Sequence, residues 1–174
     1  MEFQTLKSEK IYTGRAFNVR CDDVMLPNGR TTSLDIIEHS GAVTILPSDD
    51  EGFIWFVRQY RHAAGCELLE LPAGRLEDGE DPLECAHREI QEEIGMGARS
   101  YIKIGEFFLA PGYSTEFMHV YLAKNLFPSS LPKDVDEILD LERVPINLVL
   151  NKVETGKILD AKTIAALFLA QSHL

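Results

Sequence analysis

Residues 74–96 read GRLEDGEDPLECAHREIQEEIGM, and this stretch determines how the rest of the chain can be interpreted. Asp81 can cap the N-terminus of a helix, Pro82 suits the first helical position, and Gly95 provides a natural stop. Apolar side chains recur between these signals at helical spacing, at Leu83, Ala86, Ile90 and Ile94. The segment therefore predicts an amphipathic helix with one face toward a core.

Three acidic side chains, Glu89, Glu92 and Glu93, share one face of this predicted helix. Their carboxylates would repel each other by roughly 4 kcal/mol per pair at about 4 Å and an effective dielectric of about 20. Helical spacing places them beside the apolar stripe, at the edge of the core. This arrangement favours a site for divalent cations, although spacing alone leaves a charged, solvated helix as the alternative.

The composition predicts one globular domain of the α+β class. With 174 residues, 45% of them hydrophobic, the chain is long enough to bury a core. Strand-like and helical segments are mixed along the chain, which is typical of α+β layers. The expected strands lie within residues 7–38 and at 42–46, 53–59, 68–71, 102–109, 117–123 and 138–144, and further helices at 146–154 and 161–172. Residues 126–134, which contain Pro and Ser, are expected to form a loop.

The charge balance excludes several classes of function. A formal net charge of −11 argues against nonspecific binding to nucleic acid or to an anionic membrane. No apolar run approaches the length of a transmembrane helix, and the N-terminus MEFQTLKSEK lacks the apolar core of a signal peptide. The three cysteines are widely spaced and form no CxxC pair, so we expect reduced thiols in a cytoplasmic protein.

The chain resembles the Nudix hydrolases. Gly74, Glu80 and the run Arg88–Met96 match the Nudix box at every fixed position. This resemblance implies a Nudix fold, a mixed β-sheet sandwiched between α-helices, with an N-terminal antiparallel strand extension. We expect a single Nudix domain over residues 1–174, in which residues 1–40 form N-terminal strands for dimerisation and residues 41–174 form the catalytic core.

The resemblance also implies a metal site. The family cleaves a nucleoside diphosphate linked to another group with the help of Mg²⁺ or Mn²⁺, hard cations that prefer oxygen ligands. The expected metal ligands are Glu89 and Glu93, joined by Glu92 and by the carbonyl oxygen of Ala73. Arg88 is expected to orient these carboxylates through bidentate hydrogen bonds. A surface salt bridge is the alternative role for Arg88.

A general base must lie outside the metal ligands, because those carboxylates are occupied by the ion. In the ADP-ribose-type branch of the family the base comes from an acidic loop downstream of the box, which here is residues 133–137. The resemblance therefore implies Glu137 as the base, with Glu116 as a rival. A solvated linker is the alternative interpretation of this acidic segment.

Four segments outside the box resemble ADP-ribose pyrophosphatases. They are residues 57–61 (VRQYR), 70–74 (ELPAG), 110–114 (APGYS) and 156–163 (GKILDAKT). The resemblance implies that Arg61 contacts the diphosphate of the substrate, a contact for which a guanidinium is well suited. Glu70 is expected to bind the substrate ribose or to orient Arg61, and Arg58 is a weaker candidate that also suits a structural role.

The aromatic residues of the N-terminal strands make the nucleobase preference an open question. Many relatives hold adenine between aromatic side chains of two subunits, whereas residues 14–18 offer only Phe17 and residues 31–35 offer none. Phe17 is a candidate for substrate binding and equally for the core. Swapped N-terminal strands in relatives imply a homodimer, and the alternative is a monomer whose N-terminal sheet packs on its own body.

We therefore expect metal-dependent hydrolysis of ADP-ribose or a related nucleoside diphosphate sugar, giving a nucleoside monophosphate and a sugar phosphate. GDP-mannose is an alternative substrate within the same class. A Nudix enzyme that removes damaged nucleoside triphosphates is a further alternative, against which the downstream acidic loop and Pro111 argue. A ligand sensor without turnover is the third alternative, but such proteins usually lose box glutamates, and all of them are present here.

Overall fold

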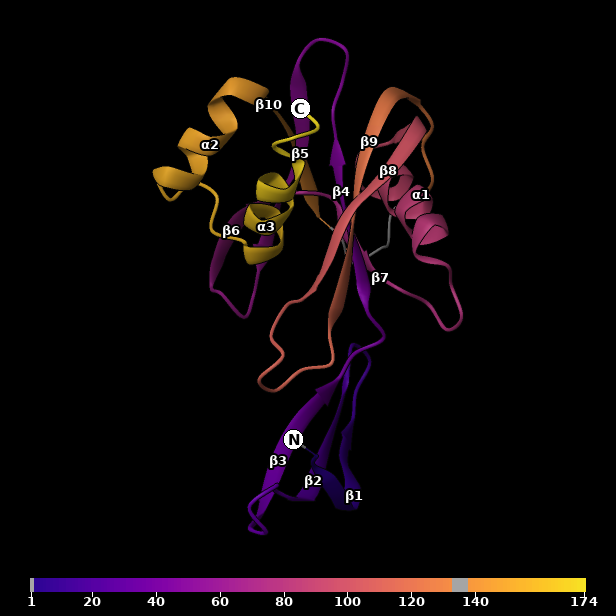
Figure 1. Cartoon of the computed structure of the whole chain (residues 1–174). Helices are drawn as coiled ribbons and strands as arrows, with labels where there is room; N and C mark the ends of the chain where they lie inside the picture. The colour runs from indigo at the N-terminus through magenta and orange to yellow at the C-terminus, as the bar shows by residue number, and fades with distance from the viewer. Residues whose placement is uncertain (1, 133–137) are drawn as a thin grey trace. The chain divides into compact units, whose positions relative to one another are not determined.

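The computed structural model describes residues 2–132 and 138–174, and the chain divides into two compact units. The first unit comprises residues 1–41 and 108–117, and the second comprises residues 42–107 and 118–174. Figure 1 shows the elements of both units, each of which is described by itself below.

The first unit is built on an antiparallel sheet. Its strands, in the order β1-β2-β3, are β1 (Gln4–Thr13), β2 (Asn18–Met25) and β3 (Thr31–Glu38). The turn between β2 and β3 closes where Leu26 N donates to the Arg30 carbonyl at 2.7 Å, and Gly29 adopts the left-handed φ of 80° that this turn requires. The predicted N-terminal antiparallel extension is therefore confirmed.

The segment around residues 110–116 is attached to the end of β3 within the same unit. Ile37 N donates to the Tyr113 carbonyl at 2.8 Å, and Thr115 N donates to the Ile37 carbonyl at 2.9 Å. The Thr115 hydroxyl also accepts from His39 N at 2.9 Å. The backbone of this segment therefore continues the hydrogen bonding of the N-terminal sheet.

The second unit contains two sheets and three helices within its described residues. One sheet has the order β7-β4-β9-β8 and the other the order β10-β5-β6. The strands are β4 (Ala42–Pro47), β5 (Phe53–Arg61), β6 (Cys66–Glu70), β7 (Ala73–Arg75), β8 (Met96–Phe108), β9 (Phe117–Pro128) and β10 (Leu139–Pro145). The helices are α1 (Pro82–Glu93), α2 (Ile146–Glu154) and α3 (Ala161–Ala170). Among the described residues, no helix has both the length and the apolar composition needed to span a bilayer.

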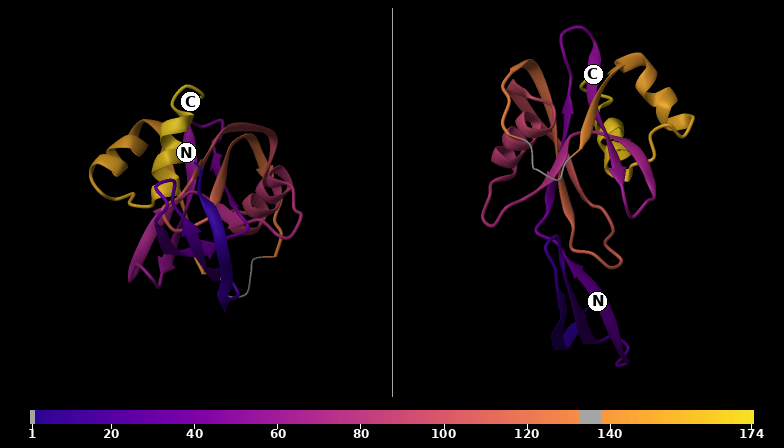
Figure 2. Two further views of the ribbon diagram at one scale, coloured as in Figure 1. Left: turned by 60° about the horizontal axis from the view of Figure 1, so that its bottom comes forward. Right: turned by 180° about the vertical axis from the view of Figure 1, so that it is seen from behind.

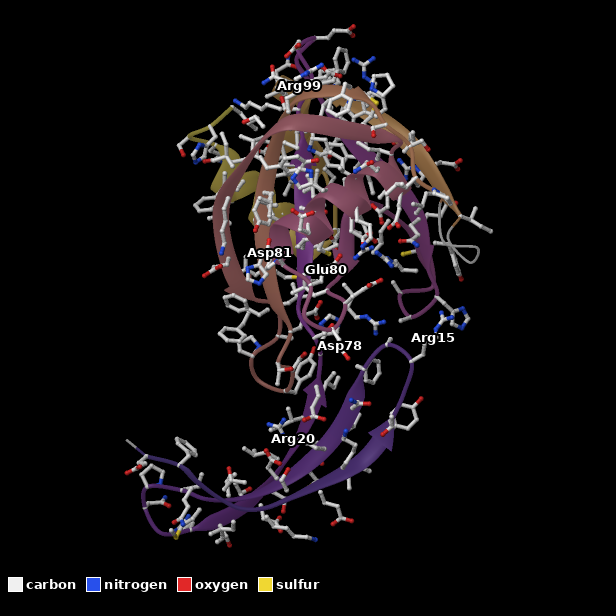
Figure 3. All side chains as sticks on the ribbon, turned by 90° about the vertical axis from the view of Figure 1, so that its right-hand side faces the viewer. Arg15, Arg20, Asp78, Glu80, Asp81 and Arg99 are labelled. Atoms are coloured by element: carbon white, nitrogen blue, oxygen red, sulfur yellow. The ribbon has the colours of Figure 1, made fainter. Side chains whose placement is uncertain are left out.

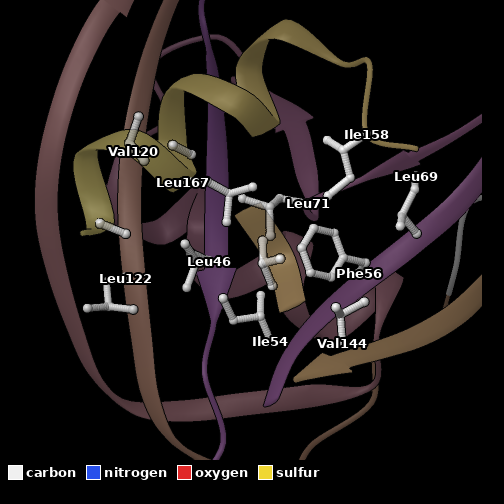
Figure 4. Packing of buried hydrophobic residues seen from close by; sticks show 13 residues of the cluster. Leu46, Ile54, Phe56, Leu69, Leu71, Val120, Leu122, Val144, Ile158 and Leu167 are labelled. Atoms are coloured by element: carbon white, nitrogen blue, oxygen red, sulfur yellow. The ribbon is translucent and has the colours of Figure 1, made fainter. Parts of the chain in front are cut away.

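The central strand β4 shows why helices cover both faces of its sheet. Every residue of β4 is buried, and its near-continuous apolar sequence suits a strand with no solvent face. Val43 and Ile45 pack in one cluster with Ile90 of α1, whereas Leu46 packs in a second cluster with Leu167 of α3. The helices lie on opposite sides of the sheet in Figures 1 and 2, and Figure 4 shows the cluster on the α3 side.

The sheet around β4 is mixed, as predicted. β4 pairs in parallel with β9 and antiparallel with β7. The predicted loop at residues 126–134 is wrong in its first part, because β9 continues to Pro128. The Phe127 ring of β9 packs over Gly97 of β8. A Cβ at Gly97 would lie only 2.7 Å from this ring, so the packing requires a residue without a side chain.

Candidate active site

The geometry of the acidic cluster begins with the way α1 is capped. The Asp81 carboxylate accepts a hydrogen bond from Leu83 N at 2.8 Å, and Pro82 occupies the first helical turn. Gly95 follows the helix with a left-handed φ of 69°. These caps confirm the predicted helix and set its rotation, so that Ile90 is fully buried and the glutamates lie at the edge of the core.

Two of the three clustered glutamates are buried. Glu89 is 7% exposed and Glu93 is 3% exposed, although carboxylates are almost never buried without partners. A carboxylate oxygen of Glu93 accepts from Ala73 N of β7 at 3.1 Å. A Cβ built on Gly74 would lie 1.8 Å from an oxygen of Glu89, so only glycine leaves room for that carboxylate. Both carboxylates therefore converge on the short strand β7.

Arg88 connects these carboxylates to the loop before the helix. One of its amino nitrogens, Nη1, donates to Glu89 at 2.6 Å and to Glu92 at 3.0 Å. Its Nε and Nη2 atoms both donate to Glu80 at 3.0 Å, and Figure 3 shows Glu80 beside the cap residue Asp81. These contacts support the predicted orienting role of Arg88 and assign Glu80 to the support of Arg88.

Carboxylates outnumber guanidinium groups in the contacts described for this cluster. Four carboxylates, those of Glu80, Glu89, Glu92 and Glu93, are held around one guanidinium or on β7. The hydrogen bond with Glu80 raises the pKa of Arg88, and the same contact lowers the pKa of Glu80, so both groups are ionised at neutral pH. The contacts described for this cluster thus join four carboxylates to one guanidinium and one backbone amide.

Within residues 2–132 and 138–174, no three His, Cys, Asp or Glu side chains are arranged as a ready-made metal site. The contacts explain this, because Arg88 bonds two of the carboxylates and the Ala73 amide bonds a third. The residues nevertheless fit a hard divalent cation. Their donor atoms are all oxygen, two of the carboxylates are buried, and the absence of a side chain at Gly74 lets the Glu89 carboxylate lie against β7.

The Arg61 candidate lies in a second charged cluster. Nε and Nη2 of Arg61 donate to the two carboxylate oxygens of Glu70 at 2.8 and 2.7 Å. Glu70 is only 1% exposed, and this bidentate contact supports the orienting role rather than a contact with ribose. Lys162 of α3 also contacts Glu70, which we did not predict, although the residue lies inside the segment 156–163 that resembles ADP-ribose pyrophosphatases.

Arg58 has a structural partner. Its guanidinium forms an ion pair with Glu142 of β10, and the same carboxylate accepts from Lys152 of α2 at 2.9 Å. These contacts join strands β5 and β10 to the helix that follows them. They favour the structural role for Arg58 over a contact with substrate.

Three candidates remain, Glu137, Glu116 and Phe17. Glu137 lies outside the described residues. Glu116 belongs to the first unit, where its amide donates to the Ser114 hydroxyl at 3.1 Å. Phe17 belongs to the same unit and is 41% exposed, which excludes a place in the core.

Phe17 has an aromatic neighbour from outside residues 14–18. The ring of Tyr12 lies 6.4 Å from the ring of Phe17, and Tyr12 is 55% exposed. Within residues 14–18 Phe17 is the one aromatic residue, and Tyr12 lies beside it from the paired strand β1. Two exposed aromatic rings therefore lie at this end of the N-terminal sheet.

Comparisons with known proteins identify the family. The sequence profile of the NUDIX domain matches residues 38–167, and that of the nucleoside diphosphate sugar hydrolase N-terminal domain matches residues 3–33. An ADP-ribose pyrophosphatase of Bacillus subtilis is 37% identical over 96% of this chain and 91% of its own length. An ADP-ribose pyrophosphatase of Mycobacterium tuberculosis is 39% identical over 94% of this chain and 81% of its own length.

A solved structure shows the same fold over the full chain. The crystal structure of an ADP compounds hydrolase superposes with a TM-score of 0.91 at 28% sequence identity, and covers 100% of this chain and 95% of its own. The family profile alone spans well over half of the sequence. The chain therefore belongs to the Nudix hydrolase family and is similar, over nearly its full length, to ADP-ribose pyrophosphatases.

Proposed function

We propose that this enzyme hydrolyses the diphosphate bridge of ADP-ribose or a closely related nucleoside diphosphate sugar, releasing a nucleoside monophosphate and a sugar phosphate. The observation that carries the proposal is the pair of buried carboxylates, Glu89 and Glu93, that converge on β7. Nudix proteins typically use a divalent metal, and Mg²⁺ or Mn²⁺ is the ion we propose here. The match to a nucleoside diphosphate sugar hydrolase N-terminal domain supports the substrate class.

The residues have distinct roles in this proposal. Glu89, Glu93 and Glu92 would hold the cation together with the Ala73 carbonyl, and Arg88 would keep the carboxylates in place. The cation, when bound, supplies positive charge to the diphosphate oxygens and polarises a water for attack. Arg61, held by Glu70, would donate to a phosphate oxygen and so orient the bridge.

The base that deprotonates the attacking water remains a proposal from sequence. We propose Glu137 because it lies in the acidic segment that supplies the base in similar enzymes, and Glu116 is the rival. Glu137→Gln should slow turnover without weakening the binding of Mn²⁺, which can be measured by electron paramagnetic resonance. The same result from Glu116→Gln, with a normal Glu137→Gln enzyme, would move the role to Glu116.

The proposed reaction is tested by product identification. The protein is incubated with ADP-ribose, GDP-mannose or dGTP, each with Mg²⁺, with Mn²⁺ and with excess chelator, and the products are separated by ion-exchange chromatography. AMP and ribose 5-phosphate from ADP-ribose, absent under chelator, are the expected products. Cleavage of GDP-mannose alone would change the substrate, pyrophosphate release from dGTP would indicate the triphosphate-directed alternative, and binding without cleavage would indicate a sensor.

We also propose that the first unit is covered by a second copy of the chain. All ten residues of β1 are exposed, and they include large apolar side chains at Leu6, Ile11 and Tyr12. An exposed apolar strand is a liability unless another surface covers it. Light scattering coupled to size exclusion should give twice the chain mass, and Leu6→Lys with Ile11→Lys should give the monomer; a monomeric parent protein would refute the proposal.

A cytoplasmic location is proposed on the state of the cysteines. Cys21, Cys66 and Cys85 are all free thiols in the structure. Unpaired cysteines are typical of a reducing compartment.

A further inference from the structure

The carboxylate of Glu70 is shared between two cations. Its Oε1 accepts from Nε of Arg61, and its Oε2 accepts from Nη2 of the same residue and also from the Lys162 ammonium. Lys162 is 13% exposed and also pairs with Asp160 at 3.0 Å. Two cations and two carboxylates therefore meet here, and Lys162 links the Arg61–Glu70 pair to Asp160.

Lys162 is held in place by the start of α3. The Asp160 carboxylate caps this helix by accepting from Thr163 N at 2.9 Å. The hydroxyl of Thr163, which is fully buried, accepts from Leu71 N at 2.9 Å. Thr163 thus fastens the start of α3 to Leu71, the residue next to Glu70, and Lys162 contacts the Glu70 carboxylate from this anchored turn.

Sharing of Glu70 has a consequence for Arg61. If Glu70 paired with Arg61 alone, a single negative charge at hydrogen-bond distance would cancel most of the guanidinium charge. Because the ammonium of Lys162 bonds the same oxygen, that negative charge is divided between two cations. The Arg61 side chain is the exposed end of the group, at 41%, and its Nη1 has no hydrogen bond to the described residues.

We propose that Lys162 is a positioning residue that acts through Glu70, leaving the charge and the Nη1 atom of Arg61 available to a phosphate oxygen of the substrate. This inference rests on the proposed function, because it assumes that Arg61 faces a diphosphate. Lys162 itself does not touch the substrate in this proposal. Its effect should therefore depend entirely on the presence of the Glu70 carboxylate.

The first test measures anion binding, which needs no turnover. The dissociation constant of inorganic pyrophosphate is measured by calorimetry with Mg²⁺ for the parent protein, Lys162→Met and Lys162→Arg. Lys162→Met should weaken binding about tenfold, and Lys162→Arg should restore it because the positive charge is kept. Lys157→Met is the matched control, since Lys157 is an exposed lysine of the same segment. If Lys162→Met does not fold, Lys162→Gln removes the same charge with a shorter polar side chain.

The second test separates a positioning residue from a direct contact. In a Glu70→Gln background, Lys162→Met should change the pyrophosphate affinity by less than about twofold, because no shared carboxylate remains. A tenfold loss that persists in this background would mean that Lys162 binds the anion itself. An unchanged affinity in Lys162→Met, or a loss also seen in Lys157→Met, would equally overturn the inference.

Turnover distinguishes this inference from the proposed function. With ADP-ribose, Lys162→Met should raise KM about tenfold and leave kcat within about twofold, since Arg61 orients the ground state and the transition state alike. A parent protein that binds pyrophosphate in a Lys162-dependent way but cleaves no nucleoside diphosphate sugar would refute the function alone. A parent protein that cleaves ADP-ribose, with a Lys162→Met variant of normal KM, would refute the inference alone.

Discussion

Two groups of buried glutamates in the second unit differ in the partners that surround them. Glu70, at 1% exposure, is surrounded by two cations and a further carboxylate, so its group is neutral overall. Glu89 and Glu93, at 7% and 3%, belong to a group with four carboxylates and one guanidinium. A buried carboxylate needs cations or hydrogen-bond donors around it; in the proposed function the second group holds a divalent cation, whereas the first holds an arginine.

Among the substitutions that test this comparison, the largest effect is expected at Glu93. Glu93→Gln should lower kcat/KM for ADP-ribose by about a thousandfold, because one charged ligand of the cation is lost. Its melting temperature without metal should stay equal to that of the parent or rise, because a repulsive charge is removed while the amide oxygen can still accept from Ala73 N.

The control for that variant is Glu84→Gln, which changes an exposed glutamate of the same helix. It should retain normal kinetics and normal Mn²⁺ affinity. A Glu93→Gln enzyme with near-normal rates would remove Glu93 from the metal site. A strongly destabilised Glu93→Gln protein would show that its carboxylate is balanced by contacts of the fold, as that of Glu70 is.

For the group around Glu70 we expect a loss of stability, in contrast to Glu93→Gln. Glu70→Gln should lower the free energy of unfolding by about 2 kcal/mol, because Arg61 and Lys162 lose the carboxylate that they share. The loss in free energy of unfolding should not be larger, because the Arg61 side chain is 41% exposed and can regain hydrogen bonds to water. Urea unfolding of Glu70→Gln and Glu93→Gln side by side checks the predicted difference in sign.

The group around Glu89 and Glu93 could be predicted from sequence to a large extent, whereas the group around Glu70 could not. The cap at Asp81, the stop at Gly95 and the spacing of the glutamates are local patterns, so they determined α1 and its acidic face. Contacts between segments far apart in the chain are invisible to such patterns. Lys162 meets Glu70 across 92 positions, and only the folded chain brings them together.

The same distinction applies to the fold. The buried strands β4 and β5 have apolar sequences that predict them directly. The ends of β8 and β9 are more polar and include Pro128, so composition indicated a loop where the two strands pair. The three-residue strand β7, which positions two carboxylates, is too short to leave any periodic signal.

A smaller loss of activity is expected from a substitution in β7, and it tests whether this strand positions Glu89. Gly74→Ala would place a Cβ where the Glu89 carboxylate now lies, so that carboxylate must move. We expect about a tenfold loss in kcat/KM and weaker Mn²⁺ binding, because displaced ligands position the cation less well. Gly112→Ala is the matched control, since a Cβ there meets no atom within 4 Å. Equal kinetics for the two variants would show that Glu89 need not lie against β7.

The smallest effect is the pH dependence of stability that Glu70 contributes. Burial by itself raises the pKa of this carboxyl, but hydrogen bonding by Arg61 and the charge of Lys162 outweigh burial, so the pKa lies below the ordinary value of 4.5. A carboxyl whose pKa is lowered by folding stabilises the folded state above its unfolded pKa, and this contribution is lost as the pH falls through the folded value. The free energy of unfolding of the parent should therefore exceed that of Glu70→Gln by a constant amount near neutral pH. That difference should shrink as the pH falls from about 5 to about 3, measured by urea unfolding. A difference that stays constant in acid would mean that Arg61 and Lys162 do not stabilise the ionised carboxylate, and the contrast between the two groups of glutamates would lose its electrostatic basis.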